Sequence, residues 1–172
     1  MEREISAFDR IESKEVADIS KLLVEQAQDV VNQFGNIIKS PYVPGEENIG
    51  KEFIDSHKEG VDSLIEAGRK FYNMDYSIVD TADNESKEEF YSMLIRTSIE
   101  CYAIILLTAK IREAKSRIEV EEWRTAVQYM CQSFKEDLEK FFQNKLVSAT
   151  RDEYLKLTMS ALFVEQSMRS VL

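Results

Sequence analysis

The stretch from Ser86 to Lys115 constrains the fold of this chain more than any other. Steps of four and three residues follow one helical seam through it, made of Phe90, Leu94, Thr97, Cys101, Ile104, Thr108 and Ile111. Further apolar residues lie off this seam and cover most of the helix circumference: Tyr102, Ala103, Ile105, Leu106, Leu107 and Ala109. A helix that is apolar on nearly every side must be packed on several sides. We therefore expect residues 86–115 to form the central helix of an all-helical domain.

Four other stretches also carry apolar stripes with helical spacing, at about residues 6–39, 51–72, 117–146 and 151–171. Capping-box pairs precede three of the expected helices: Ser86 with Glu89, Ser116 with Glu119, and Thr150 with Glu153. The chain contains only five Gly and two Pro, which favours long helices with short connections. We expect residues 1–172 to form a single all-α domain, an antiparallel up-and-down four-helix bundle with an additional fifth helix.

A change in the phase of the apolar stripe separates the central helix from the next one. The seam would continue through Lys115 and Ile118, but the next stripe runs through Val120, Trp123, Val127, Met130, Phe134 and Phe141. This jump predicts a tight hairpin that turns at about residue 116, which sets Cys101 opposite Cys131. We expect two reduced thiols that lie close together but unbonded, because packed helix axes are about 8–10 Å apart and a disulfide needs Cα atoms within about 7 Å.

The charge of the chain is acidic and unevenly distributed. The formal net charge is −10; residues 1–86 hold 19 Asp and Glu against 9 Lys and Arg, whereas residues 87–172 hold 13 of each. An acidic surface repels nucleic acid and anionic membranes, so neither is expected as a partner. The densest apolar run, from Ile99 to Ile111, has 13 residues and includes two charges, whereas a membrane span needs about 20 apolar residues. We expect a soluble, cytoplasmic protein.

The residue patterns of common metal and catalytic sites are missing from the sequence. A di-iron site in a bundle needs a Glu-x-x-His motif on each of two helices, but the chain has one histidine, His57, and Ile54 lies three residues before it. Cys101, Cys131 and His57 include no close-spaced pair of zinc ligands. Nothing in the sequence places a nucleophile at His57, and no glycine-rich phosphate loop occurs. We therefore expect no catalytic residue, no metal and no cofactor.

His57 has two interpretations. The four-residue run from His57 through Lys58 to Gly60 resembles the histidine phosphotransfer domains, which are also acidic four-helix bundles. In that family Lys and Gly follow the histidine at the third and fourth positions, whereas here Lys58 and Gly60 occupy the first and third. The resemblance implies a solvent-facing His57 that accepts a phosphoryl group. The position of His57 on the apolar seam of residues 51–72 predicts instead a half-buried structural histidine.

Arg96 and Glu100 are an unusual pair, because both lie in the most apolar helix. They are four residues apart and can form an ion pair on one helix face, which would satisfy charges that are costly to bury alone. Alternatively, they anchor a ligand held between helices, in a cavity whose lining would suit an apolar ligand: Met93, Met130, Phe134 and Tyr102. The candidate ligand-binding residues are thus Arg96, Glu100, Tyr102 and His57.

Three classes of function remain open from the sequence. The leading hypothesis is a non-enzymatic helical-bundle protein that acts through protein contacts or self-association, as a homo-oligomer. The alternative is a bundle that binds a small apolar ligand, and a histidine phosphotransfer protein is a weaker alternative. These classes differ in what they require: a filled interior, an enclosed apolar cavity, or an accessible His57.

Overall fold

The computed structural model describes residues 16–38, 41–72 and 81–144, together with residues 156, 158, 159, 162 and 166. In chain order the helices are α2 (Val16–Gly35), α3 (Ile49–Ser56), α4 (Lys58–Tyr72), α5 (Asn84–Glu113) and α6 (Arg117–Gln143). The described residues contain no strand, so the expected all-helical fold is confirmed. Two expected regions lie outside the described residues: the start of the first helix, and most of the last helix, whose five described residues are helical.

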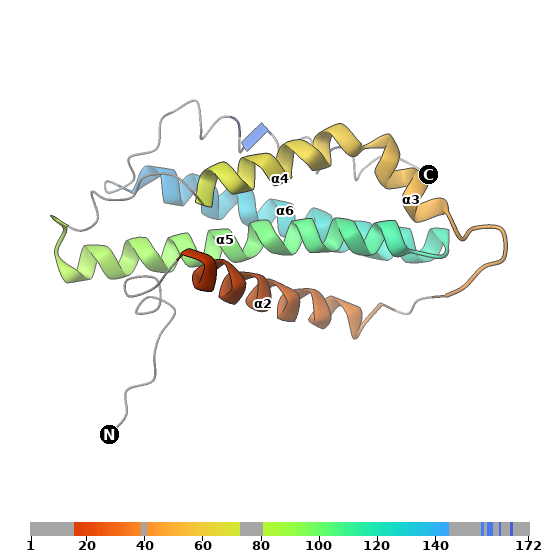
Figure 1. The fold of residues 1–172 in the computed structure, drawn as a ribbon, viewed down its shortest axis with the longest axis horizontal. Helices are drawn as coiled ribbons and strands as arrows, with labels where there is room; N and C mark the ends of the chain where they lie inside the picture. Colours follow the sequence, from red (N-terminus) through yellow and green to blue (C-terminus); the bar gives the residue numbers. More distant parts are fainter. Residues whose placement is uncertain are drawn as a thin grey trace, which may run out of the picture.

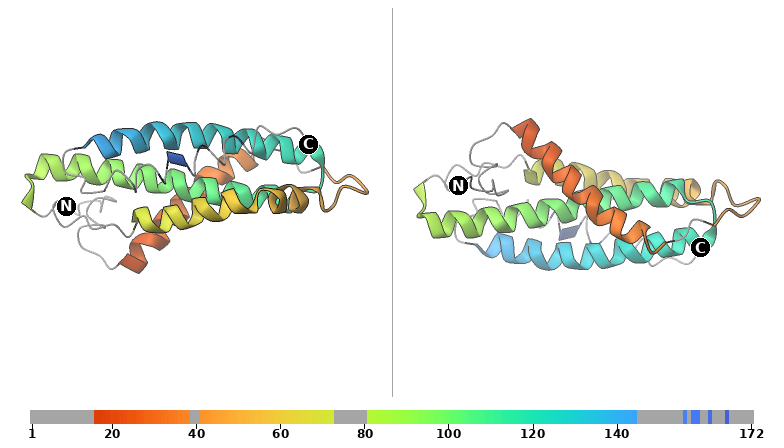
Figure 2. Two further views of the ribbon diagram at one scale, coloured as in Figure 1. Left: turned by 90° about the horizontal axis from the view of Figure 1, so that it is seen from above. Right: turned by 90° about the horizontal axis from the view of Figure 1, so that it is seen from below.

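The helix α5 lies in the middle of the molecule and contacts α2, α3, α4 and α6 (Figure 1). Successive long helices run in opposite directions, and α5 and α6 lie side by side as an antiparallel hairpin in all views (Figure 2). Figure 2 also shows that α2 crosses α5 obliquely. The structure therefore places α5 at the centre of the molecule, as its apolar circumference predicts.

The predicted seam of α5 is buried along its whole length. All seven seam residues, the first Phe90 and the last Ile111, are buried. Ala103 and Leu107 add a second buried stripe. The stripe predicted for α6 is also buried, from Val120 to Phe141. Burial of each large apolar side chain contributes about 1.5–3 kcal/mol. The contact between α5 and α6 is therefore a main source of stability.

The hairpin turns where the sequence predicts. α5 ends at Glu113 and α6 begins at Arg117, with Ser116 as its N-cap. The Ser116 hydroxyl accepts a hydrogen bond from the Glu119 backbone N–H at 3.2 Å. The Glu119 carboxylate in turn accepts a hydrogen bond from the Lys115 backbone N–H at 2.9 Å. The capping pair of Ser116 and Glu119 is thereby confirmed.

Contacts across the hairpin follow the predicted register. The ring centroids of Phe90 and Phe141 are 5.4 Å apart, and Arg96 forms an ion pair with Asp137. In each pair, one residue precedes residue 116 and the other follows it by nearly the same number of positions. The same register sets Cys101 opposite Cys131, and both cysteines are buried and neither forms a disulfide. Their separation stays a prediction.

Two helix ends differ from the expectation. α5 begins before Ser86 because Asp83 is its N-cap: the Asp83 carboxylate accepts a hydrogen bond from the Ser86 backbone N–H at 2.8 Å. The expected capping pair of Ser86 with Glu89 is therefore wrong. α2 ends at Gly35 rather than at Lys39, and the residues that follow form a turn.

The fully buried residues of α2 form a single row. Leu23, Ala27 and Val31 are buried, at a spacing of one helical turn. Ile37, within the range 6–39 expected for the first helix, is 80% exposed, because it lies in the turn beyond the helix end. Val30 and Phe34 of α2 also pack against the core but are only partly buried.

The second expected helix, residues 51–72, is two helices in the structure. The helix breaks at His57, where the Ser56 hydroxyl donates a hydrogen bond to the Phe53 carbonyl at 2.7 Å. His57 Nδ1 lies 2.8 Å from the same carbonyl oxygen. The side chains of Ser56 and His57 thus compete with the backbone N–H groups of the helix for the Phe53 carbonyl oxygen. This competition favours a break in the helix.

A glycine brings the start of α3 into direct contact with the end of α5. A Cβ atom built on Gly50 would lie 1.9 Å from the Ile111 carbonyl oxygen and 3.1 Å from the backbone nitrogen of Ala114. A residue without a Cβ is required for so close a crossing of two backbones. The break at His57 allows α3 to make this crossing while α4 follows another direction along α5.

Candidate functional site

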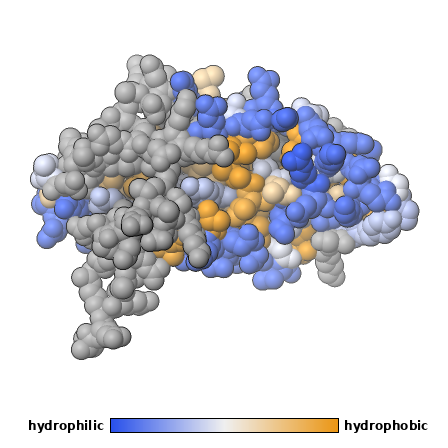
Figure 3. All heavy atoms as spheres, viewed as in Figure 1, coloured by the Kyte–Doolittle hydropathy of each residue, from blue (hydrophilic) through white to orange (hydrophobic). Residues whose placement is uncertain are grey.

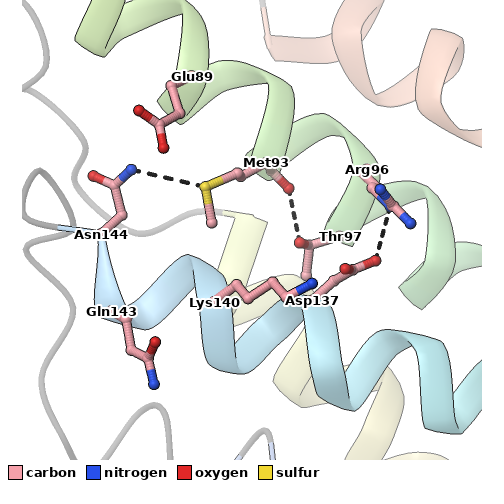
Figure 4. Close-up of a pocket in the computed structure, with 8 residues that line it drawn as sticks. All are labelled: Glu89, Met93, Arg96, Thr97, Asp137, Lys140, Gln143 and Asn144. Atoms are coloured by element: carbon pink, nitrogen blue, oxygen red, sulfur yellow. Dashed lines mark hydrogen bonds and ion pairs between the residues drawn. The ribbon is translucent and has the colours of Figure 1, made fainter.

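A groove lies between the first half of α5 and the second half of α6 (Figure 4). We call it the α5–α6 groove. It has a volume of about 420 Å³ and is lined by two acids, two bases, two carboxamides, a hydroxyl and a thioether: Glu89, Asp137, Arg96, Lys140, Gln143, Asn144, Thr97 and Met93. Most ligand pockets are predominantly apolar, with a few polar groups. Seven of the eight residues that line this groove are polar or charged, so it offers a ligand more polar groups than a typical apolar pocket does.

An ion pair between Arg96 and Asp137 connects the two walls of the groove. The distance from Arg96 Nε to Asp137 Oδ2 is 2.9 Å, yet Oδ2 accepts no aligned hydrogen bond. The Arg96 side chain is 71% exposed, whereas the Asp137 side chain is 12% exposed. The expected ion pair between Arg96 and Glu100 is therefore wrong. Arg96 extends toward solvent and α6, while Glu100 is buried in the contact between the helices.

Glu100 is a buried acid beside this ion pair. It is 7% exposed, it lies against Asp137 and Ser133, and its Oε1 atom has no hydrogen-bond partner. The pKa of Glu100 is raised to about 8, first by burial and then by a hydrogen bond with Asp137. The Ser133 hydroxyl lowers this pKa, the charge of Asp137 raises it, and the charge of Arg96 lowers it. At neutral pH Glu100 is thus mostly protonated, and the cluster of Glu100, Asp137 and Arg96 carries no net charge.

Contacts among the lining residues hold the opposite end of the groove in place. The Thr97 hydroxyl donates a hydrogen bond to the Met93 carbonyl at 2.7 Å. Asn144, the C-cap residue of α6, places its amide nitrogen 3.7 Å from Met93 Sδ. Figure 4 shows Glu89 beside these residues, on the side of the groove away from Asp137.

Of the four sequence candidates, Arg96 is the one that lines the groove; Glu100 is buried behind it, against Asp137. Tyr102 is half-buried on α5. His57 is half-buried at the break between α3 and α4, where its ring centroid lies 4.6 Å from that of Phe53. Of the four candidates, the structure brings Arg96 and Glu100 together and leaves Tyr102 and His57 elsewhere.

Asp137 is the site residue that the sequence analysis missed. It lies among charged residues on α6 and has no unusual sequence context. The register about residue 116 could have found it, because Asp137 is 21 residues after 116 and Arg96 is 20 residues before it.

A second feature of the described residues is an apolar strip on α5. Ile95, Ile99, Tyr102 and Leu106 are spaced to lie along one side of the helix, and all four are half-buried. We call these residues the α5 strip. Hydrophobic side chains gather across the middle of the face drawn in Figure 3, where α5 lies between α4 and α2. The strip is thus less covered than the seam on the other side of the same helix.

The most apolar 18-residue window of α5 has a mean hydropathy of 1.4, and 50% of it is buried. By length and composition α5 is the one helix in the described residues that could cross a membrane. A core helix of a soluble protein passes the same test, and α5 contacts four other helices.

Within residues 16–38, 41–72 and 81–144, His, Cys, Asp and Glu form no group of three or more that could hold a metal ion.

Comparisons of the chain with protein-family models, with curated proteins and with solved structures find no match. The α5–α6 groove and the α5 strip are therefore the features from which a function can be argued.

Proposed function

We propose that this protein is a non-enzymatic helical bundle that acts by self-association, with the α5 strip as its contact surface. The observation that carries the proposal is the strip itself, a row of large apolar side chains on the most apolar helix that are only partly buried. Contiguous apolar surface of this kind marks protein contacts in soluble proteins. Aromatic and aliphatic residues such as Tyr102 and Leu106 are suited to the centre of such a contact.

Charges at the two ends of the strip favour a second copy of the chain as the partner. Glu88 and Lys110 lie on the same side of α5 as the strip, 11 residues before and 11 residues after Ile99. When two copies pack antiparallel through the strip, Glu88 of each copy meets Lys110 of the other. An interface of this symmetry closes after two copies, so the proposed assembly is a dimer.

The bundle architecture expected from the sequence is part of the same proposal. We infer an antiparallel up-and-down four-helix bundle of α3–α4, α5, α6 and the last expected helix, with α2 as the fifth helix. The alternating helix directions in Figure 1 support it. In the last expected helix the described residues divide into half-buried Thr158 and Leu162 and exposed Lys156, Met159 and Gln166. That division is typical of a helix with one side against a core.

The two alternatives receive less support from the geometry. An apolar ligand would need an apolar cavity, and the α5–α6 groove is lined mainly by charged and carboxamide side chains. A phosphotransfer histidine needs an accessible ring, and His57 Nδ1 lies within hydrogen-bond distance of the Phe53 carbonyl. The acidic net charge and the two buried cysteines, which form no disulfide, support a soluble, cytoplasmic protein.

Native mass spectrometry of the full chain tests the proposed dimer. The chain has a mass of 20.0 kDa, so we expect a species of twice that mass. At about 100 µM protein, a dimer with a Kd of about 1–10 µM would predominate. A monomer alone under these conditions would contradict the proposal.

Two sets of variants show whether the strip is the contact surface. Ile99→Glu should weaken the dimer by about tenfold or more, whereas Ile118→Glu, at a 61% exposed position on α6, should leave it unchanged. Lys110→Glu should also weaken it, and the double change Glu88→Lys with Lys110→Glu should restore it. Circular dichroism establishes that each variant is folded. Equal effects of Ile99→Glu and Ile118→Glu, or no rescue by the charge exchange, would show that the contact lies elsewhere.

A further inference from the structure

Glu100 and Asp137 form a carboxyl pair that joins α5 to α6 inside the hairpin. Glu100 is 7% exposed, the Asp137 side chain is 12% exposed, and a hydrogen bond connects the two. An ionised carboxylate only accepts hydrogen bonds, so a hydrogen bond between two carboxyl groups requires a proton on one of them. This link between the two helices therefore depends on one bound proton.

Few charges surround this carboxyl pair. Among the described residues, Asp137 from α6 and Arg96 from α5 are the charged groups that act on Glu100. Arg96 Nε lies 2.9 Å from Asp137 Oδ2 and balances the charge of that carboxylate (Figure 4). Lys140 of α6 and Glu89 of α5 also line the groove and add one charge of each sign. Because the Arg96 side chain is 71% exposed, water screens its charge, and it would balance a second carboxylate poorly.

Loss of the bound proton would bring two negative charges into contact where little water reaches them. Like charges repel more strongly in such surroundings than in water. The pKa of Glu100 is accordingly raised to about 8, first by burial and then by the hydrogen bond with Asp137. In an open form that admits water, its pKa returns toward 4.5. Between these values the closed form holds a proton that the open form has released, so closure weakens as pH rises.

The two halves of the hairpin differ in what else holds them together. Near the turn, Gly50 of α3 lies against the backbone of Ile111 with no room for a side chain. On the other side of the carboxyl pair, Phe90 and Phe141 are in contact, but the groove of about 420 Å³ separates α5 and α6 beside them. Local opening occurs where buried contacts are fewest. Loss of the proton should therefore loosen the half that contains the groove.

We propose that the Glu100–Asp137 pair is a pH-sensitive latch for the half of the α5–α6 hairpin that contains the groove. The protonated pair holds the two helices together, with Arg96 balancing the charge of Asp137. When the proton leaves at neutral to alkaline pH, α5 and α6 separate there more often, while the turn end stays closed. The latch is independent of the proposed dimer, because it requires none of the residues of the α5 strip.

Reaction of Cys101 with methyl methanethiosulfonate tests the latch. Cys101 directly follows Glu100, is 3% exposed, and burial raises the pKa of its thiol to about 12, so the closed form should not react. The rate on the native full chain, divided by the rate on the same chain in concentrated urea at the same pH, gives the opening constant. We expect this constant to rise at least about tenfold from pH 6 to pH 8. An opening constant that does not change with pH would overturn the proposal.

Matched variants show whether Glu100 is the group that releases the proton. Glu100→Gln keeps the size of the side chain but has no proton to release, so its opening constant should change by less than about threefold over the same pH range. Glu136→Gln removes a charge at the exposed position beside Asp137 and should keep the wild-type rise. Equal pH profiles for the two variants would overturn the assignment to Glu100.

The urea dependence of labelling distinguishes local opening from global unfolding, and it needs only the wild-type chain. Global unfolding exposes much surface and is strongly favoured by urea, whereas local opening exposes little. At pH 8 we expect labelling to be nearly constant at low urea. The fluorescence of Trp123, the single tryptophan, should not change between pH 6 and pH 8, because it is 5% exposed near the turn. Labelling that follows global unfolding at every urea concentration would contradict the latch.

Discussion

The two ends of the α5–α6 hairpin are built differently, although the same two helices run through both. At the turn end, Gly50 of α3 contacts the backbone of Ile111 and Ala114 with no room for a side chain between them. The Val43 backbone N–H also donates to the Lys115 carbonyl at 3.4 Å. At the other end, polar and charged side chains line the space between the helices and leave a groove of about 420 Å³.

The difference shows how one hairpin can be both a scaffold and a site. Small and apolar residues at the turn end allow close packing, which removes water and contributes stability. Glu100 and Asp137 at the open end need polar partners, so neither a third helix nor an apolar side chain can close over them without loss. We expect changes at the turn end to act mainly on folding, and changes at the open end to act mainly on pH dependence.

The largest effect is expected for Ile111→Ala at the turn end. Ile111 is fully buried beneath the α3 crossing, and truncation of such a side chain destabilises by about 2–5 kcal/mol. Ile118→Ala is the control, because this side chain is 61% exposed and its loss should change stability by less than about 0.5 kcal/mol. Urea unfolding followed by circular dichroism measures both. Equal losses would mean that the turn end is not the packed end.

Gly50→Ala should have the next largest effect. The added methyl group would lie 1.9 Å from the Ile111 carbonyl oxygen, so α3 must move away from α5. Overpacking of this kind destabilises by about 1–3 kcal/mol. Gly35→Ala is the matched control: its methyl group would make an ordinary contact of 3.6 Å with Trp123, and stability should not fall. A neutral Gly50→Ala in the same urea experiment would break the comparison between the two ends.

Glu100→Gln should remove a pH dependence that arises at the open end. The pKa of Glu100 is raised from 4.5 to about 8 in the folded chain, so between these values the folded chain holds a proton that the unfolded chain has released. Stability should therefore fall as pH rises from about 5 to about 8, by up to about 1.4 kcal/mol per pH unit, and level off above. Urea unfolding at several pH values should show a flatter profile for Glu100→Gln than for the wild type.

The control for this experiment is Glu139→Gln, at an exposed position on α6. It removes the same charge but should leave the slope of stability against pH unchanged. A profile for Glu100→Gln parallel to that of the wild type would mean that Glu100 is ionised in the folded chain.

The smallest changes in stability are expected when the ion pairs at the two ends of the hairpin are broken. Arg112→Gln breaks a contact of 3.4 Å with Asp55 in which both side chains are about half-exposed, and should change stability by less than about 0.5 kcal/mol. Arg96→Gln leaves the more buried Asp137 without its cation, and should destabilise by about 1 kcal/mol. Thermal unfolding of the two variants measures the difference. A larger effect for Arg112→Gln would contradict the proposed role of Arg96.

Much of the scaffold could be predicted from the sequence, because its signals are local. The α5 seam follows from periodicity, and the break at Ser116 follows from a phase change together with a capping pair three residues apart. The start of α5 was harder to predict, because Asp83 and Ser86 are both good N-cap residues. The structure uses Asp83, whose carboxylate contacts both the backbone and the hydroxyl of Ser86.

The candidate site could be predicted only in part. The sequence singles out Arg96 and Glu100 because charges are rare in so apolar a helix. The sequence does not show that Arg96 points to solvent while Glu100 points into the contact between α5 and α6. Both lie on α5 and can reach each other along its surface, so an ion pair between them is equally compatible with the sequence. The partner Asp137 comes from another helix, so its role depends on how the two helices face each other.

By itself, the sequence determined the all-helical class, the central place of α5 and the turn at residue 116, since hydrophobic periodicity and capping act within a few residues. Only the tertiary structure decided the break at His57, the crossing at Gly50 and the pairing of Arg96 with Asp137. The last two depend on contacts between residues distant in the chain, and the break at His57, which contacts with the Phe53 carbonyl favour, allows α3 to make the crossing. Such contacts are selected by packing and by the satisfaction of buried polar groups, and neither quantity exists until the helices are assembled.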